Sequence, residues 1–252
     1  MIVAGIQHDI VWETPDANFE RLAPMIAKAA AAGARLVVLS EMFSTGFSMK
    51  TERIAEPPEG RSVSFLVDQA RANDVWLCAS VPERTAADER PFNQCVIAAP
   101  DGVTHRYAKI HPFGYGREHE HYAAGEQFLT VDIEGTRCSF FVCYDLRFAD
   151  EFWQVAKVTD CYIVPANWPA SRREHWMALL RARAIENQAY VVGVNRVGAG
   201  GKLDYAGDSM IVDPLGEILT IAGDAETTIA ADVDPRRVEQ VRAEFPFLQD
   251  RR

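Results

Sequence analysis

Short apolar runs alternate along the chain with longer segments whose apolar residues recur at helical spacing. Residues 2–8 form the first apolar run, and the segment TPDANFERLAPMIAKAAAAGA follows it. Thr14 stands just before Pro15 and is expected to cap a helix that Gly33 ends. The apolar residues of this segment fall near one helical stripe, at Phe19, Leu22, Ile26 and Ala30. The pattern predicts a strand followed by an amphipathic helix.

The same alternation continues through the rest of the chain and predicts an α/β fold. Buried strands are predicted at residues 35–41, 75–81, 138–145, 161–167, 190–198 and 227–234. Helices are predicted at residues 61–73, 148–158 and 171–188 and near the C-terminus, and hairpins at 92–110 and 208–221. Residues 110–126 have no clear periodicity and predict a long surface loop. Since no linker or repeat interrupts the pattern, one domain spanning residues 1–252 is expected.

Composition and charge narrow the class of protein. Hydrophobic residues make up 48% of the chain and charged residues 25%, which is ordinary globular usage. The net charge is −10 and no run of lysine or arginine suggests a basic face, so no nucleic-acid partner is expected. The first residues lack the features of a signal peptide, and no apolar run approaches the length of a membrane span. A cytoplasmic protein without a membrane partner is therefore expected.

The cysteines and histidines give no sign of a metal or a disulfide framework. The five cysteines are odd in number and include no Cys-x-x-Cys pair, which fits a reducing compartment. His119 and His121 stand two residues apart, but no third ligand at matching spacing follows. We therefore expect neither a metal nor a cofactor.

Three reactive side chains stand at or near the ends of predicted strands. Glu41 ends the run RLVVLSE, Cys143 ends the run SFFVC, and Lys109 lies at the end of the hairpin. Sites in open α/β sheets form at the carboxyl ends of strands. A thiol needs a base or a neighbouring cation to become a nucleophile, because its free pKa is about 8.5. If the ammonium of Lys109 lies nearby, Cys143 is expected to be an accessible thiol with a low pKa. A buried core cysteine, a solvated glutamate and a surface lysine are the alternative, and sequence spacing leaves both open.

Four segments resemble the motifs of the nitrilase superfamily of carbon–nitrogen hydrolases. They are LSEMFSTGF, RYAKIHPF, VCYDLRFAD and the stretch that begins NWPASRREHW, and the resemblance runs from about residue 2 to about residue 235. It implies a four-layer α-β-β-α sandwich in which Cys143 is the nucleophile and Glu41 the general base. Lys109 and the backbone N–H of Tyr144 are then the oxyanion donors. A second glutamate of the family matches Glu118 better than Glu120.

Within that family, EMFSTGF and NWPA resemble the omega-amidase branch. This implies a small-molecule amide substrate, a monoamide of a dicarboxylic acid such as 2-oxoglutaramate, hydrolysed through a thioester. N-carbamoyl amidase, aliphatic amidase and nitrilase activities remain alternatives on the same scaffold. Two hypotheses without amide hydrolysis are a non-catalytic interaction module and a cysteine-based redox sensor. A redox sensor needs a second, resolving thiol, and Cys138 is disfavoured for this role because it is expected to face away from Cys143 on the same strand. The family also implies a homodimer.

An arginine is expected to bind the carboxylate of the substrate, because its planar guanidinium can donate two parallel hydrogen bonds to it. Arg172 and Arg173 follow NWPA, and Arg173 is the predicted ligand. Arg147 is either a second clamp or, as favoured here, a structural partner of Glu186. The predicted pocket wall comprises Phe43, Tyr115 and Trp168.

Overall fold

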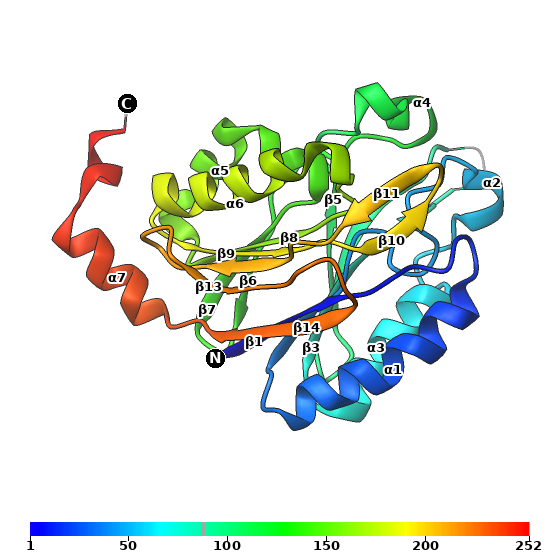
Figure 1. Cartoon of the computed structure of the whole chain (residues 1–252), viewed down its shortest axis with the longest axis horizontal. Helices are drawn as coiled ribbons and strands as arrows, with labels where there is room; N and C mark the ends of the chain where they lie inside the picture. Colours follow the sequence, from blue (N-terminus) through cyan, green and yellow to red (C-terminus); the bar gives the residue numbers. More distant parts are fainter. Residues whose placement is uncertain (87–88, 252) are drawn as a thin grey trace.

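Two six-stranded β-sheets face each other and carry helices on their outer sides (Figure 1). The structure, a computed structural model, describes residues 1–86 and 89–251. Helices α1 (Pro15–Ala31) and α3 (Arg61–Asn73) cover one sheet, and helices α5 (Ala149–Val155) and α6 (Arg173–Asn187) cover the other. The α-β-β-α order of layers implied by the family resemblance is confirmed.

The first sheet has the strand order β14-β1-β2-β3-β4-β5. The three strands β1, β2 and β3 run parallel, and β14, β4 and β5 pair antiparallel with their neighbours. The bounds are β1 (Ile2–Gln7), β2 (Leu36–Val38), β3 (Trp76–Glu83), β4 (Phe92–Ala98), β5 (Thr104–Ala108) and β14 (Thr227–Asp232). The predicted hairpin at residues 92–110 is the pair β4–β5.

The second sheet has the strand order β13-β12-β9-β8-β7-β6, and a separate hairpin joins β10 and β11. Strands β7, β8 and β9 are its parallel centre. The bounds are β6 (Thr130–Ile133), β7 (Thr136–Phe140), β8 (Cys161–Pro165), β9 (Tyr190–Val194), β10 (Val197–Gly200), β11 (Leu203–Ala206), β12 (Met210–Val212) and β13 (Ile218–Ile221). The remaining helices are α2 (Thr51–Ile54), α4 (Glu118–His121) and α7 (Pro235–Glu244), with short 3₁₀ turns elsewhere.

Apolar side chains from both sheets meet between them, and a second cluster lies between the first sheet and α1 and α3. Burial of this apolar surface is the main term that holds the layers together. Gly5 lies where β1 approaches β9, and a Cβ there would come within 2.7 Å of a methyl carbon of Val194. Glycine therefore permits the close approach of the two sheets. Among the described residues, no helix combines the length and apolar character needed to span a membrane.

Two local predictions for the first helix and the long loop need correction. Thr14 precedes α1 but makes no side-chain cap, because its hydroxyl donates to the carbonyl of Trp12 instead. The side-chain oxygen of Asn18 instead accepts a hydrogen bond from the N–H of Val11 in the segment before the helix. The segment 110–126 is not a surface loop throughout, since Glu118 is fully buried. An isolated glutamate in a glycine-rich segment shows no periodicity by which its burial could be recognised.

The strand predicted at residues 138–145 ends early, at Phe140. Cys143 begins a 3₁₀ turn, Cys143–Arg147, with φ of +48°. A non-glycine residue in this left-handed region is uncommon and interrupts a strand. Cys138 and Cys143 therefore do not share one strand, and the expectation that they face opposite sides by strand alternation loses its basis. Cys138 instead pairs in register with Cys161 of β8.

Candidate active site

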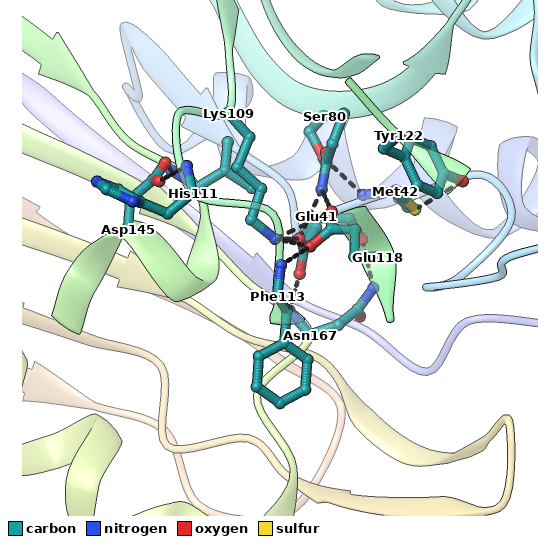
Figure 2. A network of polar contacts seen from close by, with 12 residues as sticks. Glu41, Met42, Ser80, Lys109, His111, Phe113, Glu118, Tyr122, Asp145 and Asn167 are labelled. Carbon is teal, nitrogen blue, oxygen red and sulfur yellow. Dashed lines mark hydrogen bonds and ion pairs between the residues drawn. The ribbon is translucent and has the colours of Figure 1, made fainter. Parts of the chain in front are cut away.

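The side chain of Lys109 lies between two buried carboxylates (Figure 2). Its Nζ donates to Glu41 Oε1 at 2.9 Å and to Glu118 Oε2 at 2.8 Å. All three side chains are almost fully shielded from solvent. Burial opposes the charge of Lys109, but the carboxylates of Glu118 and Glu41 outweigh it and raise the pKa well above its usual value. Lys109 is therefore held as an ammonium and cannot serve as the base.

Glu41 lies in a turn just after β2, held from both sheets. Its Oε1 also accepts from Asn93 Nδ2 at 2.7 Å, and its Oε2 accepts from the backbone N–H of Asn167 at 2.8 Å. The next residue, Met42, has φ of +44° and donates its N–H to Ser80 Oγ. These contacts fix the direction of the carboxylate, as a base that must meet one proton requires.

Glu118 begins α4 and faces inward from the loop. The carboxylate accepts from the N–H of Phe113 as well as from Lys109. Asn93 Nδ2 donates to Glu118 Oε1 at 3.0 Å and to Glu41, so one amide group joins both glutamates. Glu118 is thus saturated by donors around Lys109, whereas Glu41 also interacts with Cys143. Of the two glutamates, Glu41 is therefore the one whose carboxylate bonds the thiol of Cys143.

Cys143 meets this cluster from the second sheet. Burial raises the pKa of its thiol well above the ordinary value, and the Glu41 carboxylate raises it further, whereas Lys109 lowers it. These influences require Glu41 and Lys109 to be close to the sulfur, so the structure brings the three predicted side chains together. The expectation of a low-pKa thiol is wrong, because burial and the Glu41 carboxylate shift the pKa upward and favour the protonated form.

A small cavity opens beside Cys143. The space inside it that a water-sized sphere reaches is about 20 Å³, so the cavity as it stands has room for about one water molecule. Its lining residues are Phe113, Cys143, Tyr144, Arg147, Trp168 and Arg172. Trp168, one of the predicted wall residues, is therefore at the cavity, and its ring lies 4.7 Å from the guanidinium carbon of Arg147.

Three predicted substrate residues lie elsewhere. Phe43 is fully buried and packs with Phe19 and Phe65 in the apolar cluster under α1 and α3. Tyr115 is 88% exposed and does not line the cavity. Arg173 is half-exposed, does not line the cavity and makes an ion pair with the buried Asp208 at 2.8 Å. A buried aromatic ring, an exposed ring and a cavity ring look alike in a sequence, so position alone could not separate them.

The favoured role for Arg147 is also wrong. Glu186 pairs with Arg183, one helical turn away, at 2.8 Å. Arg147 instead lines the cavity and lies at 3.2 Å from His175 Nδ1. Its neighbour Arg172 lies over the ring of Phe113 at 5.4 Å. When several arginines stand at spacings that suit the same glutamate, the sequence alone does not show which of them forms the ion pair.

Sequence reasoning missed Asn93, Phe113 and Asn167. No single motif marks them, although Asn93 is the second residue of the predicted strand FNQC and Asn167 lies in NWPA. Asn93 bonds both glutamates, Phe113 bonds Glu118, and Asn167 bonds Glu41. No group of three histidine, cysteine or acidic side chains within residues 1–86 and 89–251 is arranged to hold a metal ion.

Thiol reagents give a first test of this arrangement. We expect iodoacetamide to modify Cys143 before the other four cysteines, because it lines the cavity while they are fully buried. Since its pKa is raised, the rate should keep increasing with pH beyond about 8.5. Peptide mapping over time at several pH values measures both. Earlier labelling of Cys78 or Cys161, or a rate that levels off below pH 8 or so, would contradict the expectation.

Comparison with known proteins gives consistent matches along nearly the whole chain. The sequence profile of the family described as "Carbon-nitrogen hydrolase" matches residues 2–243. The chain is 37% identical to omega-amidase YafV of Escherichia coli strain K12, over 97% of this chain and 94% of that protein. It is 32% identical to the 2-oxoglutaramate amidase of Bacillus subtilis strain 168, over 98% and 96% of the two chains.

A solved structure agrees in fold. XC1258 from Xanthomonas campestris, described as a CN-hydrolase superfamily protein with an arsenic adduct in the active site, superimposes with a TM-score of 0.93. The two chains are 35% identical, and the match covers 100% of this chain and 97% of XC1258.

Proposed function

Because the chain belongs to the carbon–nitrogen hydrolase family, and is thus a hydrolase that acts on carbon–nitrogen bonds, we propose that it is a cysteine-dependent omega-amidase. Its substrate is the monoamide of a small dicarboxylic acid, of the 2-oxoglutaramate type. Relatives with amidase names that cover nearly the whole chain support this choice.

The observation that carries the substrate class is a pair of arginines without acidic partners beside Cys143. Arg147 and Arg172 both line the cavity, and within the described part of the chain neither makes an ion pair with a carboxylate. Burial lowers the pKa of Arg147, and the neighbouring charge of Arg172 lowers it further. Two cations that destabilise each other in a partly buried site favour an anionic ligand. The distal carboxylate of a dicarboxylic monoamide supplies that charge, whereas a simple aliphatic amide or nitrile does not.

The proposed first half-reaction forms a thioester. Glu41 accepts the thiol proton as Cys143 Sγ attacks the amide carbon. The ammonium of Lys109 and the N–H of Tyr144 stabilise the oxyanion; the latter lies in the first turn of the 3₁₀ segment, where N–H groups lack acceptors within the turn. Glu41 then gives its proton to the leaving nitrogen, and ammonia departs as the carbonyl re-forms.

The second half-reaction returns the enzyme to its starting state. Glu41, again a carboxylate, takes a proton from a water molecule that attacks the thioester carbon. Collapse of the second tetrahedral intermediate releases the dicarboxylic acid, and Cys143 recovers its proton. Glu118 and Asn93 keep Lys109 and Glu41 in place throughout and exchange no proton.

Substitution of Arg147 tests the carboxylate clamp. We expect Arg147→Ala to raise KM for 2-oxoglutaramate by about 10- to 100-fold, since a hydrogen bond to a charged group contributes roughly 1.5–3 kcal/mol. Steady-state kinetics with detection of ammonia measures it. The matched control is Arg173→Ala, which removes a neighbouring arginine that pairs with Asp208 outside the cavity and should leave KM unchanged. Equal effects of the two substitutions would contradict the clamp.

A substrate panel tests the activity itself. Ammonia release is compared for 2-oxoglutaramate, N-carbamoyl amino acids, aliphatic amides and nitriles at equal concentration. We expect the highest kcat/KM with 2-oxoglutaramate; a clear preference for a neutral amide or a nitrile would assign the chain to another branch of the family.

We further propose a homodimer located in the cytoplasm that binds neither nucleic acid nor membranes. The acidic net charge supports the proposal that the protein binds neither nucleic acid nor membranes. Exposed apolar side chains of α6 and of the β12–β13 hairpin offer surface for a second copy, at Ile185, Leu215 and Leu219. Sedimentation analysis of the purified chain determines the oligomeric state.

A further inference from the structure

A fully buried carboxylate, Asp145, lies two residues after Cys143 and is not used by the mechanism above. It accepts three hydrogen bonds (Figure 2 shows it beside His111). Asp145 Oδ1 accepts from the N–H of His111 at 2.8 Å. Its Oδ2 accepts from the N–H of Val142 at 2.9 Å and from the hydroxyl of Tyr107 at 2.8 Å. Because the side chain is fully buried, its oxygens accept no hydrogen bonds from bulk solvent.

The three donors belong to the two segments that carry Lys109 and Cys143. Tyr107 and His111 lie two residues before and two residues after Lys109, at the end of β5 in the first sheet. Val142 immediately precedes Cys143, and Asp145 itself lies in the 3₁₀ turn that Cys143 begins. One carboxylate thus joins the segment of the oxyanion donor to the turn of the nucleophile, across the space between the two sheets.

This arrangement has an energetic cost at neutral pH. Burial raises the pKa of Asp145 to about 6, although Lys109 and the three donors counteract it. A folded-state pKa above the unfolded value means that the folded state loses stability as pH rises from about 4 to about 6. A local cost to stability at one residue is most often found where function requires the geometry.

We propose that Asp145 is a positioning residue that sets Lys109 and Cys143 at the separation needed for attack and oxyanion binding. The proposal rests on the function proposed above for these two side chains. Asp145 acts through its bonds to the N–H groups of His111 and Val142 and to the hydroxyl of Tyr107, and it contacts no substrate.

Asp145→Asn tests the proposal because an asparagine has only one acceptor oxygen. Its NH₂ group must face a donor, the N–H of His111 or of Val142, so one of the two backbone bonds is lost. A displacement of about 1 Å in a catalytic group can reduce the rate about 10²-fold. We therefore expect kcat to fall about 10²-fold, with KM for 2-oxoglutaramate within about threefold of wild type because the arginines remain.

The matched control is Asp213→Asn. Asp213 is another buried aspartate, and its Oδ1 accepts from the N–H groups of Leu215 and Glu217 in the turn between β12 and β13, away from the cavity. Both substitutions remove a buried carboxylate that binds two backbone N–H groups. Because both of these N–H groups donate to the same oxygen, asparagine at position 213 keeps both bonds, so we expect a smaller fall in melting temperature than for Asp145→Asn and no loss of kcat. Similar kcat in the two variants would overturn the positioning role.

A second readout needs no amide substrate. Lys109 lowers the pKa of the Cys143 thiol, so moving the two groups apart raises that pKa. A rise of about one pKa unit reduces the thiolate fraction, and with it the rate of alkylation by iodoacetamide, about tenfold at pH 7 or so. If wild type fails to hydrolyse 2-oxoglutaramate, the proposed function fails while this rate still tests the positioning; an unchanged alkylation rate in Asp145→Asn overturns the positioning alone.

Should Asp145→Asn not fold, Tyr107→Phe carries the test. It removes only one donor and keeps the carboxylate and both backbone bonds. We expect a smaller loss of kcat in the same direction, about fivefold, without a change in KM. A loss of less than about twofold would overturn the proposal.

Discussion

Replacement of Cys143 by alanine is expected to abolish amide hydrolysis, with a loss of about 10⁶-fold in kcat as for other catalytic nucleophiles. The reason is that no second thiol can substitute: the other four cysteines are fully buried in the sheets and away from the cavity. The fold should survive, because alanine removes only one sulfur atom at the cavity surface. Ammonia release measures the first expectation and thermal melting the second.

Cys161→Ala is the control for Cys143→Ala. It removes an equally small side chain from β8, in the core. We expect it to lower the melting temperature more than Cys143→Ala does, since it leaves a small void, and to leave kcat unchanged. Appreciable amidase activity in Cys143→Ala would refute the nucleophile assignment.

Lys109→Ala is expected to reduce kcat by at least about 10²–10³, the usual cost of one oxyanion donor. The structure adds a second consequence. Glu41 and Glu118 both bond to Lys109 Nζ, so its removal leaves two buried carboxylates without their cation. Breaking a buried ion pair in this way costs about 3–5 kcal/mol of stability. Melting curves recorded beside the kinetics separate the two effects.

Lys109→Gln controls for the loss of folding. Glutamine keeps a donor near the glutamates but carries no charge, so we expect a smaller fall in melting temperature than for alanine, with a comparable loss of kcat. A near-normal rate in either folded variant removes Lys109 from the mechanism.

Much of the fold follows from patterns that act over short distances. The helix at Arg61–Asn73 and the hairpin β4–β5 lie where apolar periodicity and the Asp101-Gly102 turn predict them. The motifs around Glu41, Lys109 and Cys143 bring together three side chains that composition alone left as separate possibilities. Their convergence could be anticipated only through the resemblance to a family.

The remaining features of the site depend on the direction in which side chains point and on the local dielectric environment. Neither can be read from the order of residues before the chain is folded. Arg173 and Arg172 are adjacent, yet only Arg172 lines the cavity because Arg173 turns toward Asp208. The thiol of Cys143 was expected to have a low pKa from its cationic neighbour Lys109. Burial and the Glu41 carboxylate outweigh that cation and reverse the direction. Such balances are set by tertiary packing.

The pairing of β14 with β1 bears on how the protein is made. Residues 227–232 bond along the whole of residues 2–7, so two strands far apart in the sequence complete one edge of this sheet. Until residues 227–232 have been synthesised, one edge of β1 has unpaired N–H and C=O groups that can bond to another nascent chain. The first sheet is therefore completed only after β14 has been made, although its other five strands are translated well before.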